Sequence, residues 1–288
     1  MTPMSLPADA HVHSEWSWDT GGPHSDAMGR MRATCERAVR IGLPALVFTE
    51  HLDFPGTWRS RSEDLMDHQQ GFLGGDGLVK HPVFEPQGYF EAIERMRGEF
   101  VELSILTGVE FGQPHVHEAD ARALVDLDSL DRINGSLHTL DMGSGVRAEP
   151  ATLYSEHRAA DVVWAYLAEI PVMVAGSDAF HTFTHIDYVA RAWPSWELGP
   201  FDPRPFEEGY RAAMRAIAES GRALEMNTGR LWSWVPQWWA EEGGRAVSFG
   251  SDAQTPDALA RNFPEAVAML EHFGFRPGRQ PWDFWTRG

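Results

Sequence analysis

Two histidines separated by one residue, His11 and His13, lie near the start of the chain and are followed at short range by Asp19. Side chains two residues apart on a β-strand point to the same side, so both imidazoles can reach one metal ion. His115 and His117 repeat the spacing in a polar stretch after a proline, where we expect solvated surface side chains. The first pair alone therefore does not define a site, and the other polar residues of the chain decide its meaning.

Further imidazole and carboxylate side chains lie at or near the ends of apolar, strand-like runs. These residues are Glu50, His51, Glu110, His138, His185 and Asp252. Polar groups at the ends of successive strands can converge on one point in an α/β barrel. A carboxylate in such a place is costly to bury unless it is paired or binds metal. Convergent His, Asp and Glu with almost no cysteine are typical of a hydrolytic site with several divalent ions, so we predict a metalloenzyme.

The elements that must position these residues alternate between apolar runs of strand length and amphipathic stretches of helix length. The expected strands are Ala8–His13, Ala45–His51, Ser104–Phe111, Arg132–His138, Val172–Gly176, Ala223–Asn227 and Ala246–Asp252. The expected helices lie near residues 26–40, 88–102, 118–127, 152–169, 205–220, 236–243 and 257–273, with Pro264 interrupting the last one. Strict alternation predicts parallel pairing with crossover helices. Polar residues at the ends of nearly all seven strands favour a barrel over a doubly wound sheet, so we predict one α/β domain over residues 1–288.

Two connections between these elements are long, near residues 55–87 and 193–205. Both follow segments that carry candidate ligands, so we expect both to lie over the mouth of the barrel. Connections of this length are either lids and substrate-recognition elements or ordered surface loops, and both interpretations stay open. Trp16 and Trp18 lie between His13 and Asp19, where they either pack in the core or form a wall of the substrate pocket.

Composition limits the classes of protein and partner. The 288 residues are 43% hydrophobic, which supplies a large core, and the 42 acidic against 24 basic residues give a net charge of −18. Such a surface disfavours tight binding to DNA or RNA, but it is compatible with a small phosphorylated substrate at a metal site. The start MTPMSLPADA does not have the features of a signal peptide, and we find no apolar run of membrane-spanning length, so we expect no membrane association and a cytoplasmic location. The single cysteine, Cys35, excludes an intramolecular disulfide and is expected on the packed face of the first helix.

The ordered motifs of the chain resemble those of a known family. They are HVHSEWSWD, FTEH, TGVEFG, NGSLH, THIDYVAR and GSDA, and their order is similar to that of the polymerase and histidinol phosphatase (PHP) superfamily, more narrowly to its histidinol-phosphate phosphatase branch. The similarity spans residue 9 to near residue 260, and the order of the motifs is specific although no single motif is. The resemblance implies a distorted seven-stranded (β/α) barrel of TIM-like form, with a trinuclear metal centre at the C-terminal face of the strands.

The resemblance also implies which residues hold the first two ions. The ligands of the first ion would be His11, His13, Glu110 and Asp252. The ligands of the second ion would be Glu110, which bridges the two ions, with His138 and His185.

A third ion would be held by Asp19 and His51, and here the chain departs from the family pattern. The family commonly has histidine at the position of Asp19 and again at Gln254, two residues after Asp252. A carboxylate is a competent ligand, whereas a neutral amide oxygen is a poorer donor than imidazole. The third ion would then be weakly held, replaced by a harder ion such as Mn²⁺, or missing. We therefore expect two or three divalent ions, which would be Zn, Mn or Fe.

The activity implied by the resemblance is that of a phosphomonoesterase that converts L-histidinol phosphate to L-histidinol and phosphate in histidine biosynthesis. A metal-activated water would attack phosphorus in line with the leaving alkoxide, with Glu110, His138 and Asp252 in the catalytic centre. Arg191, in the pattern HIDYVAR, either clamps the phosphate or forms a surface ion pair. Two alternatives stay open: a related phosphoesterase acting on another small phosphorylated metabolite or a nucleotide, and a non-catalytic regulatory module stabilised by metal. The oligomeric state is not predictable from the sequence.

Overall fold

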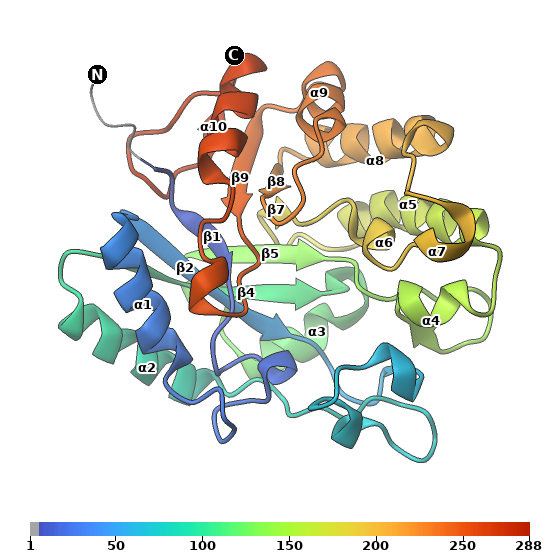
Figure 1. Ribbon diagram of the computed structural model, residues 1–288, viewed down its shortest axis with the longest axis horizontal. Helices are drawn as coiled ribbons and strands as arrows, with labels where there is room; N and C mark the ends of the chain where they lie inside the picture. The colour runs from blue at the N-terminus through green and yellow to red at the C-terminus, as the bar shows by residue number, and fades with distance from the viewer. Residues whose placement is uncertain (1–5) are drawn as a thin grey trace.

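The computed structural model of the chain describes residues 6–288, so the expectation about a signal peptide falls partly outside the described residues. A curled, mostly parallel sheet occupies the centre, and helices surround it (Figure 1). In spatial order its strands are β1 (Asp9–Val12), β2 (Ala45–Leu52), β4 (Ser104–Gly112), β5 (Arg132–Ser136), β7 (Thr182–Phe183), β8 (Ala223–Asn227), β9 (Ala246–Gly250) and β10 (Trp285–Thr286). The last strand pairs antiparallel with β9. The sheet thus has eight strands, and the expected count of seven is wrong because β10 adds an edge strand near the C-terminus.

The helices follow the strands in alternation, as parallel pairing requires. They are α1 (Arg30–Ile41), α2 (Pro86–Glu99), α3 (Pro114–Leu124), α4 (Pro150–Tyr154), α5 (Ala159–Gly176), α6 (Tyr188–Arg191), α7 (Ser195–Leu198), α8 (Glu207–Glu219), α9 (Trp234–Glu241) and α10 (Phe263–His272). α1 ends at Gly42, which has a φ of 71° and donates its N–H to the last turn, as a left-handed cap does. Pro264 lies in the first turn of α10, so the expected helix over 257–273 is in fact a 3₁₀ turn (Pro256–Ala258) followed by α10.

One expected strand is wrong. Residues 172–176 form the end of the 18-residue helix α5. The strand in that part of the sheet is β7 (Thr182–Phe183), which begins six residues after Gly176. A short apolar run cannot be distinguished from part of a buried helix by its periodicity alone. The strand β7 has two residues and was hidden in a segment rich in polar side chains, HTFTH.

The first strand, β1, lies beside the segment that follows β9. The N–H of Asp252, just after β9, donates to the carbonyl of His11 in β1 at 2.9 Å, and the N–H of His13 donates to the carbonyl of Ala253 at 2.9 Å. These bonds, with the parallel bridge between Val12 and Ala253, bring the first and last motifs of the chain together.

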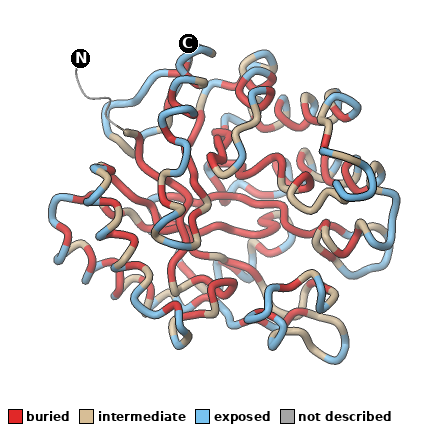
Figure 2. The backbone as a smooth tube through the Cα atoms, in the orientation of Figure 1, coloured by how far each residue is buried: buried red, intermediate tan, exposed pale blue. Residues whose placement is uncertain are grey.

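The register of the paired strands places polar residues side by side at one edge of the sheet. Across β2 and β4, His51 is opposite Glu110, and across β4 and β5, Glu110 is opposite Asn134. The polar residues at the ends of neighbouring parallel strands therefore lie side by side. The central strands are almost wholly buried, whereas exposed residues gather on the outer faces of the helices and on the loops (Figure 2).

The helix α5 is long and apolar enough, by length and composition, to cross a membrane. Buried helices of globular proteins have the same properties, and α5 contains the charged residues Asp161 and Glu169. It packs against α8 and α3, with Tyr166 and Ile170 fully buried. These contacts are those of a core helix. Cys35 is also fully buried, in α1, as its sequence context predicts.

The two long connections make different kinds of contact. Residues 53–85 lie beside α4 at the lower right of Figure 1 and form β3 (Trp58–Arg59), which pairs in parallel with β6 (Arg147–Ala148). Arg59 and Asp64 of this connection contact Glu156 and Thr152. In residues 193–205, by contrast, Trp193 and Phe201 pack edge to face with ring centroids 5.3 Å apart.

Tyr89 links α2 to the β2–β4 pair through its fully buried hydroxyl group, and we predict that the link stabilises the fold. The hydroxyl donates to the carbonyl of Phe48 at 2.7 Å and accepts from the N–H of Gly108 at 2.8 Å. Tyr89→Phe leaves both backbone groups without this partner, so the free energy of unfolding should fall by about 1–3 kcal/mol. Urea unfolding measures the change, and metal content should stay the same because the Tyr89 hydroxyl bonds to backbone groups and to none of the candidate ligands. Unchanged stability would contradict the prediction.

Candidate metal centre

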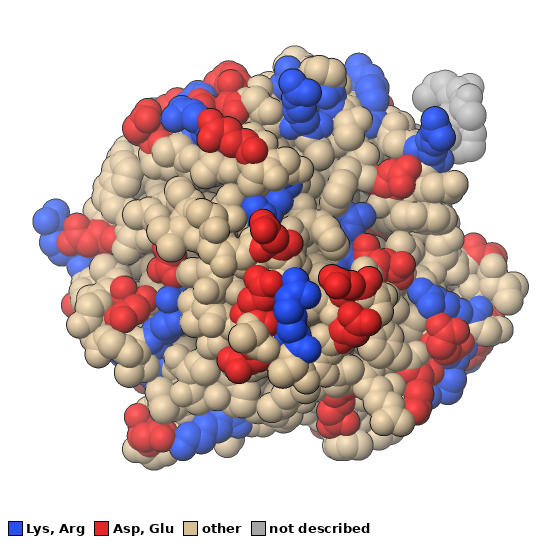
Figure 3. Space-filling model, turned by 180° about the vertical axis from the view of Figure 1, so that it is seen from behind, with Lys and Arg blue, Asp and Glu red and all other residues tan. Residues whose placement is uncertain are grey.

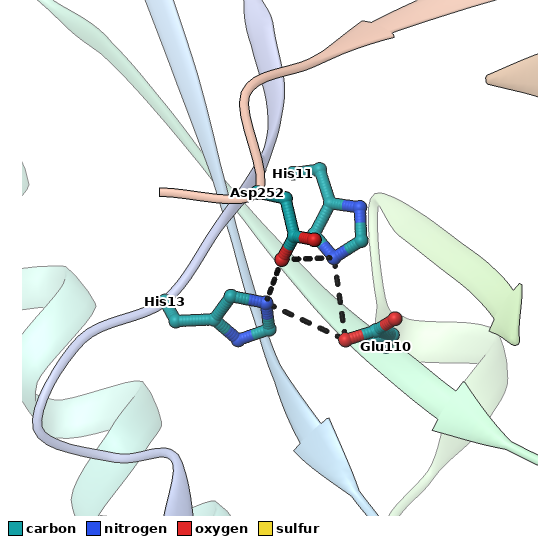
Figure 4. A group of neighbouring side chains, drawn as sticks. All are labelled: His11, His13, Glu110 and Asp252. Carbon is teal, nitrogen blue, oxygen red and sulfur yellow. Dashed lines mark ion pairs between the residues drawn. The ribbon is translucent and has the colours of Figure 1, made fainter. Parts of the chain in front are cut away.

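The first and last motifs of the chain form the centre of a buried polar cluster. His11 Nε2 lies 3.2 Å from Glu110 Oε2 and 3.6 Å from Asp252 Oδ1. His13 Nε2 lies 3.4 Å and 3.3 Å from the same two oxygens. Figure 4 shows the four side chains pointing toward one common point from β1, β4 and the segment after β9. Their facing atoms all lie within 4.8 Å of one another, which is a spacing that one bound ion can span.

Glu110 connects this group to two others. Its Oε1 lies 3.0 Å from His138 Nε2 and 2.6 Å from His185 Nε2, which makes a second group of possible ligands. Its Oε2 also lies 3.2 Å from His51 Nδ1. His51 Nε2 in turn faces Asp19 Oδ2 at 3.5 Å, and a third group consists of His13, Asp19 and His51. The structure therefore brings together the eight His, Asp and Glu side chains that the sequence indicates as metal ligands.

A fourth group, which the sequence did not indicate, joins Asp53 to His51 and His138. Asp53 Oδ2 lies 3.3 Å from His51 Nδ1, and Asp53 Oδ1 lies 3.7 Å from His138 Nδ1. Trp18 fixes this carboxylate by donating its indole N–H at 3.0 Å. Gly112 is the reason that Asp53 can approach, because a Cβ at that position would collide with the Asp53 carboxylate. The signal in the sequence was an aspartate two residues after His51, on the same face of the strand end.

Several buried ligand atoms in these groups have no hydrogen-bond partner among the described residues. They are His11 Nε2, His13 Nε2, Asp19 Oδ1, His51 Nδ1 and His185 Nδ1. Buried polar atoms are nearly always paired, so a concentration of unpaired ones needs an explanation. Three of the five, His11 Nε2, His13 Nε2 and His51 Nδ1, lie 3.2–3.4 Å from Glu110 Oε2 in the cluster described above. Nitrogen and oxygen donors arranged in this way fit divalent first-row ions such as Zn, Mn or Fe.

The electrostatics of the cluster favour bound positive charge. Burial by itself would lower the pKa of His11, but the carboxylates of Glu225, Glu110 and Asp252 raise this pKa well above its ordinary value. Burial would likewise raise the pKa of Glu110, yet the imidazoles of His11, His138 and His51 hold it well below its ordinary value. The same negative field that draws protons to the imidazoles attracts metal cations.

Glu225 of β8 positions two of the imidazoles, and the sequence analysis missed it. His11 Nδ1 lies 2.5 Å from Glu225 Oε1, and the backbone N–H of His185 donates to Glu225 Oε2 at 2.8 Å. A carboxylate behind an imidazole fixes the ring and leaves the other nitrogen free for a metal. The nearby Gly250 makes room, because a Cβ there would collide with Glu225 and lie 2.6 Å from His11 Cβ. A charged residue in the middle of a buried strand was the available signal.

His13 is positioned by a different chain of hydrogen bonds. Its Nδ1 lies 3.0 Å from Ser17 Oγ, which donates to Glu50 Oε2 at 2.6 Å. Glu50 is fully buried and also accepts from the N–H and the hydroxyl group of Ser14. Glu50 therefore supports the cluster from behind.

Three residues at this site have a positive φ angle, which is unusual for residues other than glycine. The φ angles are 24° for His185, 54° for Asp252 and 50° for Gln113. Gln113 Oε1 accepts the N–H of His138 at 2.7 Å, which holds the segment after β5 in place. Such conformations cost roughly 1–3 kcal/mol each and persist where the surrounding structure enforces them, commonly at functional sites.

A cavity of about 200 Å³ opens above the cluster. Arg191 and Gln254 contribute to its wall. Arg191 Nη2 donates to Asp252 Oδ2 at 2.7 Å, so the arginine is paired with a candidate ligand and borders the cavity as well. The backbone carbonyl of Gln254 accepts a hydrogen bond from Arg30 at 2.7 Å, and the Gln254 side chain takes no part in this bond.

Other parts of the wall come from the first long connection, with Trp58, Asp64, Leu65, Met66 and Gln69. Residues 193–205 contribute none of the lining side chains. Trp18 borders this cavity, whereas Trp16 packs toward Gly88 of α2 and does not line it.

The second histidine pair is not at this site, but it is also not the solvated surface pair that we expected. His115 and His117 lie in the first turn of α3, and their side chains are only 9% and 8% exposed. His115 Nε2 lies 3.0 Å from Glu169 of α5, and His117 packs on Phe54 at 4.9 Å between ring centroids. A polar stretch after proline was in this case the start of a packed helix.

Comparison with known proteins identifies the same part of the chain. The family model described as the PHP domain matches residues 9–229, more than half of the chain. Histidinol-phosphatase from Lactococcus lactis is 24% identical over 282 residues, which cover 93% of this chain and 91% of that protein. A probable histidinol-phosphatase from Clostridium acetobutylicum is 24% identical over 203 residues, covering 68% and 76%.

A solved structure is similar over nearly the whole fold. The crystal structure of histidinol phosphate phosphatase from Lactococcus lactis, in complex with zinc, L-histidinol and phosphate, superposes with a TM-score of 0.72. It is 22% identical in sequence and covers 94% of this chain and 95% of its own. At this identity the similarity establishes the α/β fold with its curled sheet.

We predict that Glu225 controls metal affinity from behind the ligands. Glu225→Gln keeps the size of the side chain but removes the charge that fixes His11, so metal should bind about 10–100-fold more weakly. Dialysis against a graded chelator followed by metal analysis measures this change. The exposed Glu219→Gln, at the end of α8, is the matched control and should retain metal as the wild type does. Equal retention in both variants would contradict the role of Glu225.

Proposed function

The chain belongs to the PHP domain family, and we propose that it is a metal-dependent phosphomonoesterase that hydrolyses L-histidinol phosphate to L-histidinol and phosphate. One observation carries the proposal: overlapping groups of imidazoles and carboxylates, two of which share Glu110, lie beneath an open cavity. Four relatives named histidinol-phosphatase or probable histidinol-phosphatase, each aligned over most of its own length, support this choice of substrate.

Three of the four groups have a proposed ion. His11, His13, Glu110 and Asp252 bind the first, and Glu110, His138 and His185 bind the second. Asp19 and His51 bind the third, with His13 at hand and Gln254 in the same cavity wall. Divalent ions in such a site supply a nucleophilic water at neutral pH and neutralise the charge on the phosphoryl oxygens. Zn, Mn and Fe all suit this mixture of nitrogen and oxygen donors.

The protein's own side chains orient the reacting groups. Arg191 uses one nitrogen, Nη2, for its bond to Asp252, which leaves further N–H donors free for phosphoryl oxygens at the cavity wall. Asp252 uses Oδ2 for Arg191 and directs Oδ1 to His11 and His13. The arginine therefore acts twice, by fixing a metal ligand and by binding the substrate's phosphate.

The remaining expectations concern shape, partners and location. We interpret the curled sheet as a distorted barrel, because hydrogen bonds join β1 to the segment after β9. Acidic and basic side chains are interspersed on the face seen in Figure 3, and the net charge of −18 disfavours a nucleic-acid partner. We expect the enzyme to act in the cytoplasm on a small phosphorylated metabolite.

We predict that loss of a single central ligand abolishes turnover without unfolding the chain. Asp252→Asn removes the charge that faces both His11 and His13, and His138→Ala removes a ligand of the second ion. Phosphate release from L-histidinol phosphate should fall more than about 100-fold in each variant, since loss of a ligand costs more than loss of its supporting group. Circular dichroism checks the fold, and the exposed Asp257→Asn is the control. Near-normal phosphate release by both variants after metal reloading would refute the proposed function.

We also predict that position 254 limits the third ion. Gln254→His introduces a better donor at the cavity wall beside the Asp19–His51 group, so the variant should retain more metal per chain after dialysis. Gln254→Leu, which removes the amide, should keep the ions of the first two groups. Metal analysis of the three proteins, purified in parallel, decides the matter. Identical metal content in wild type and Gln254→His would exclude this explanation.

A further inference from the structure

The cavity wall contains six carboxylates, and they differ in their partners. They are Asp19, Asp53, Asp64, Glu110, Glu149 and Asp252. Five of them form ion pairs with a histidine or an arginine. Glu149 is different: over residues 6–288 it has no ion-pair partner, and its hydrogen-bond contact is with the Tyr188 hydroxyl group, which donates at 3.4 Å.

Helix capping does not account for a carboxylate at position 149 either. The residue directly precedes α4, but its side chain does not cap that helix. Burial raises the pKa of the Glu149 carboxyl group to about 7, despite the opposing effect of His138. Glu149 is half-buried in this wall and has no cation beside it among the described residues, so a bound cation would offset the cost of its partial burial.

Tyr188 connects Glu149 to the proposed metal ligands. The Tyr188 ring contacts the rings of His138 and His185, with centroids 4.9 and 5.1 Å apart, and the Arg191 guanidinium lies 5.2 Å from its centroid. In L-histidinol phosphate the carbon with the amino group is bonded to the ester CH₂ group. A phosphoryl group at Arg191 and the metal ligands therefore brings the ammonium group close to this wall.

Asp64 is the other wall carboxylate outside the four His, Asp and Glu groups, and it is a poor alternative. Asp64 accepts two hydrogen bonds from Arg61, at 2.8 and 2.7 Å, and one from the Thr152 hydroxyl group at 2.8 Å. This bidentate pair already compensates its charge.

We propose that Glu149 is a specificity-determining residue that binds the ammonium group of the substrate. This inference rests on the proposed function and narrows it: the preferred substrates are phosphomonoesters with a primary ammonium group on the carbon next to the ester carbon. A site built to pair a half-buried charge discriminates against an analogue without the opposite charge, because the carboxylate is then left unpaired.

A comparison of two substrates tests the inference. The substrates are L-histidinol phosphate and its analogue without the amino group, 3-(imidazol-4-yl)propyl phosphate. In Glu149→Gln, kcat/KM for L-histidinol phosphate should fall about 10–100-fold, mainly through KM, whereas the value for the analogue should change less than about twofold. Glu94→Gln, on the exposed side of α2, is the matched control and should change neither value.

Binding of the product gives a readout that is independent of turnover. Calorimetry should show that Glu149→Gln weakens L-histidinol binding by a similar factor, while inhibition by inorganic phosphate, metal content and thermal stability stay as in the wild type. Equal losses on both substrates, or unchanged L-histidinol binding, would overturn the inference and leave a phosphatase of different specificity. If the wild-type enzyme releases phosphate from neither substrate, the proposed function fails and the inference fails with it.

Discussion

The buried carboxylate of Glu110 is the group on which the rest of the site depends. It is 1% exposed, and both of its oxygens are surrounded by imidazoles: His11, His13 and His51 at Oε2, and His138 and His185 at Oε1. An isolated carboxylate in such a place would be protonated or destabilising, so the cluster exists only as a whole. Because each oxygen faces its own set of nitrogens, one residue can join two ion sites. The positions of all the other ligands are set relative to this residue.

A curled parallel sheet is well suited to assembling such a cluster. Every parallel strand ends at the same edge, and the curl turns that edge toward a common centre. The β2–β4 register places His51 opposite Glu110, and the hydrogen bonds between β1 and residues 252–253 bring Asp252 to His11. The supporting carboxylates need close backbone approach, which Gly112 allows for Asp53 and Gly250 for Glu225. The glycines of the motifs TGVEFG and SFGSD thus serve the ligands indirectly.

The ligands were predictable from the sequence because they break a pattern. A histidine or carboxylate at the end of an apolar run, as at His51, Glu110 or Asp252, is costly without a function, and six of the seven expected strands were placed correctly. Glu225 and Asp53 were not found, because their role is to contact other side chains and only the fold reveals those contacts. The mistaken strand at 172–176 and the short strand β7 show the same limit for the backbone. An apolar run of five residues is compatible with both structures, and packing against the sheet decides between them.

The same cluster that makes the site also opposes folding. Burying carboxylates close together costs free energy, and the left-handed conformations of His185 and Asp252 add strain in the same region. The apolar core beneath the helices must offset that cost, and any ion that binds the folded chain and not the unfolded chain adds stability by mass action. Metal affinity and fold stability are therefore linked through Glu110 and its neighbours. Glu149 lies outside this linked set, since the other cavity carboxylates have cationic or imidazole partners and Glu149, over residues 6–288, has a hydrogen bond from Tyr188 alone. Its charge can thus be matched by a ligand that comes and goes, which is what substrate recognition requires and what a permanent metal ligand cannot provide.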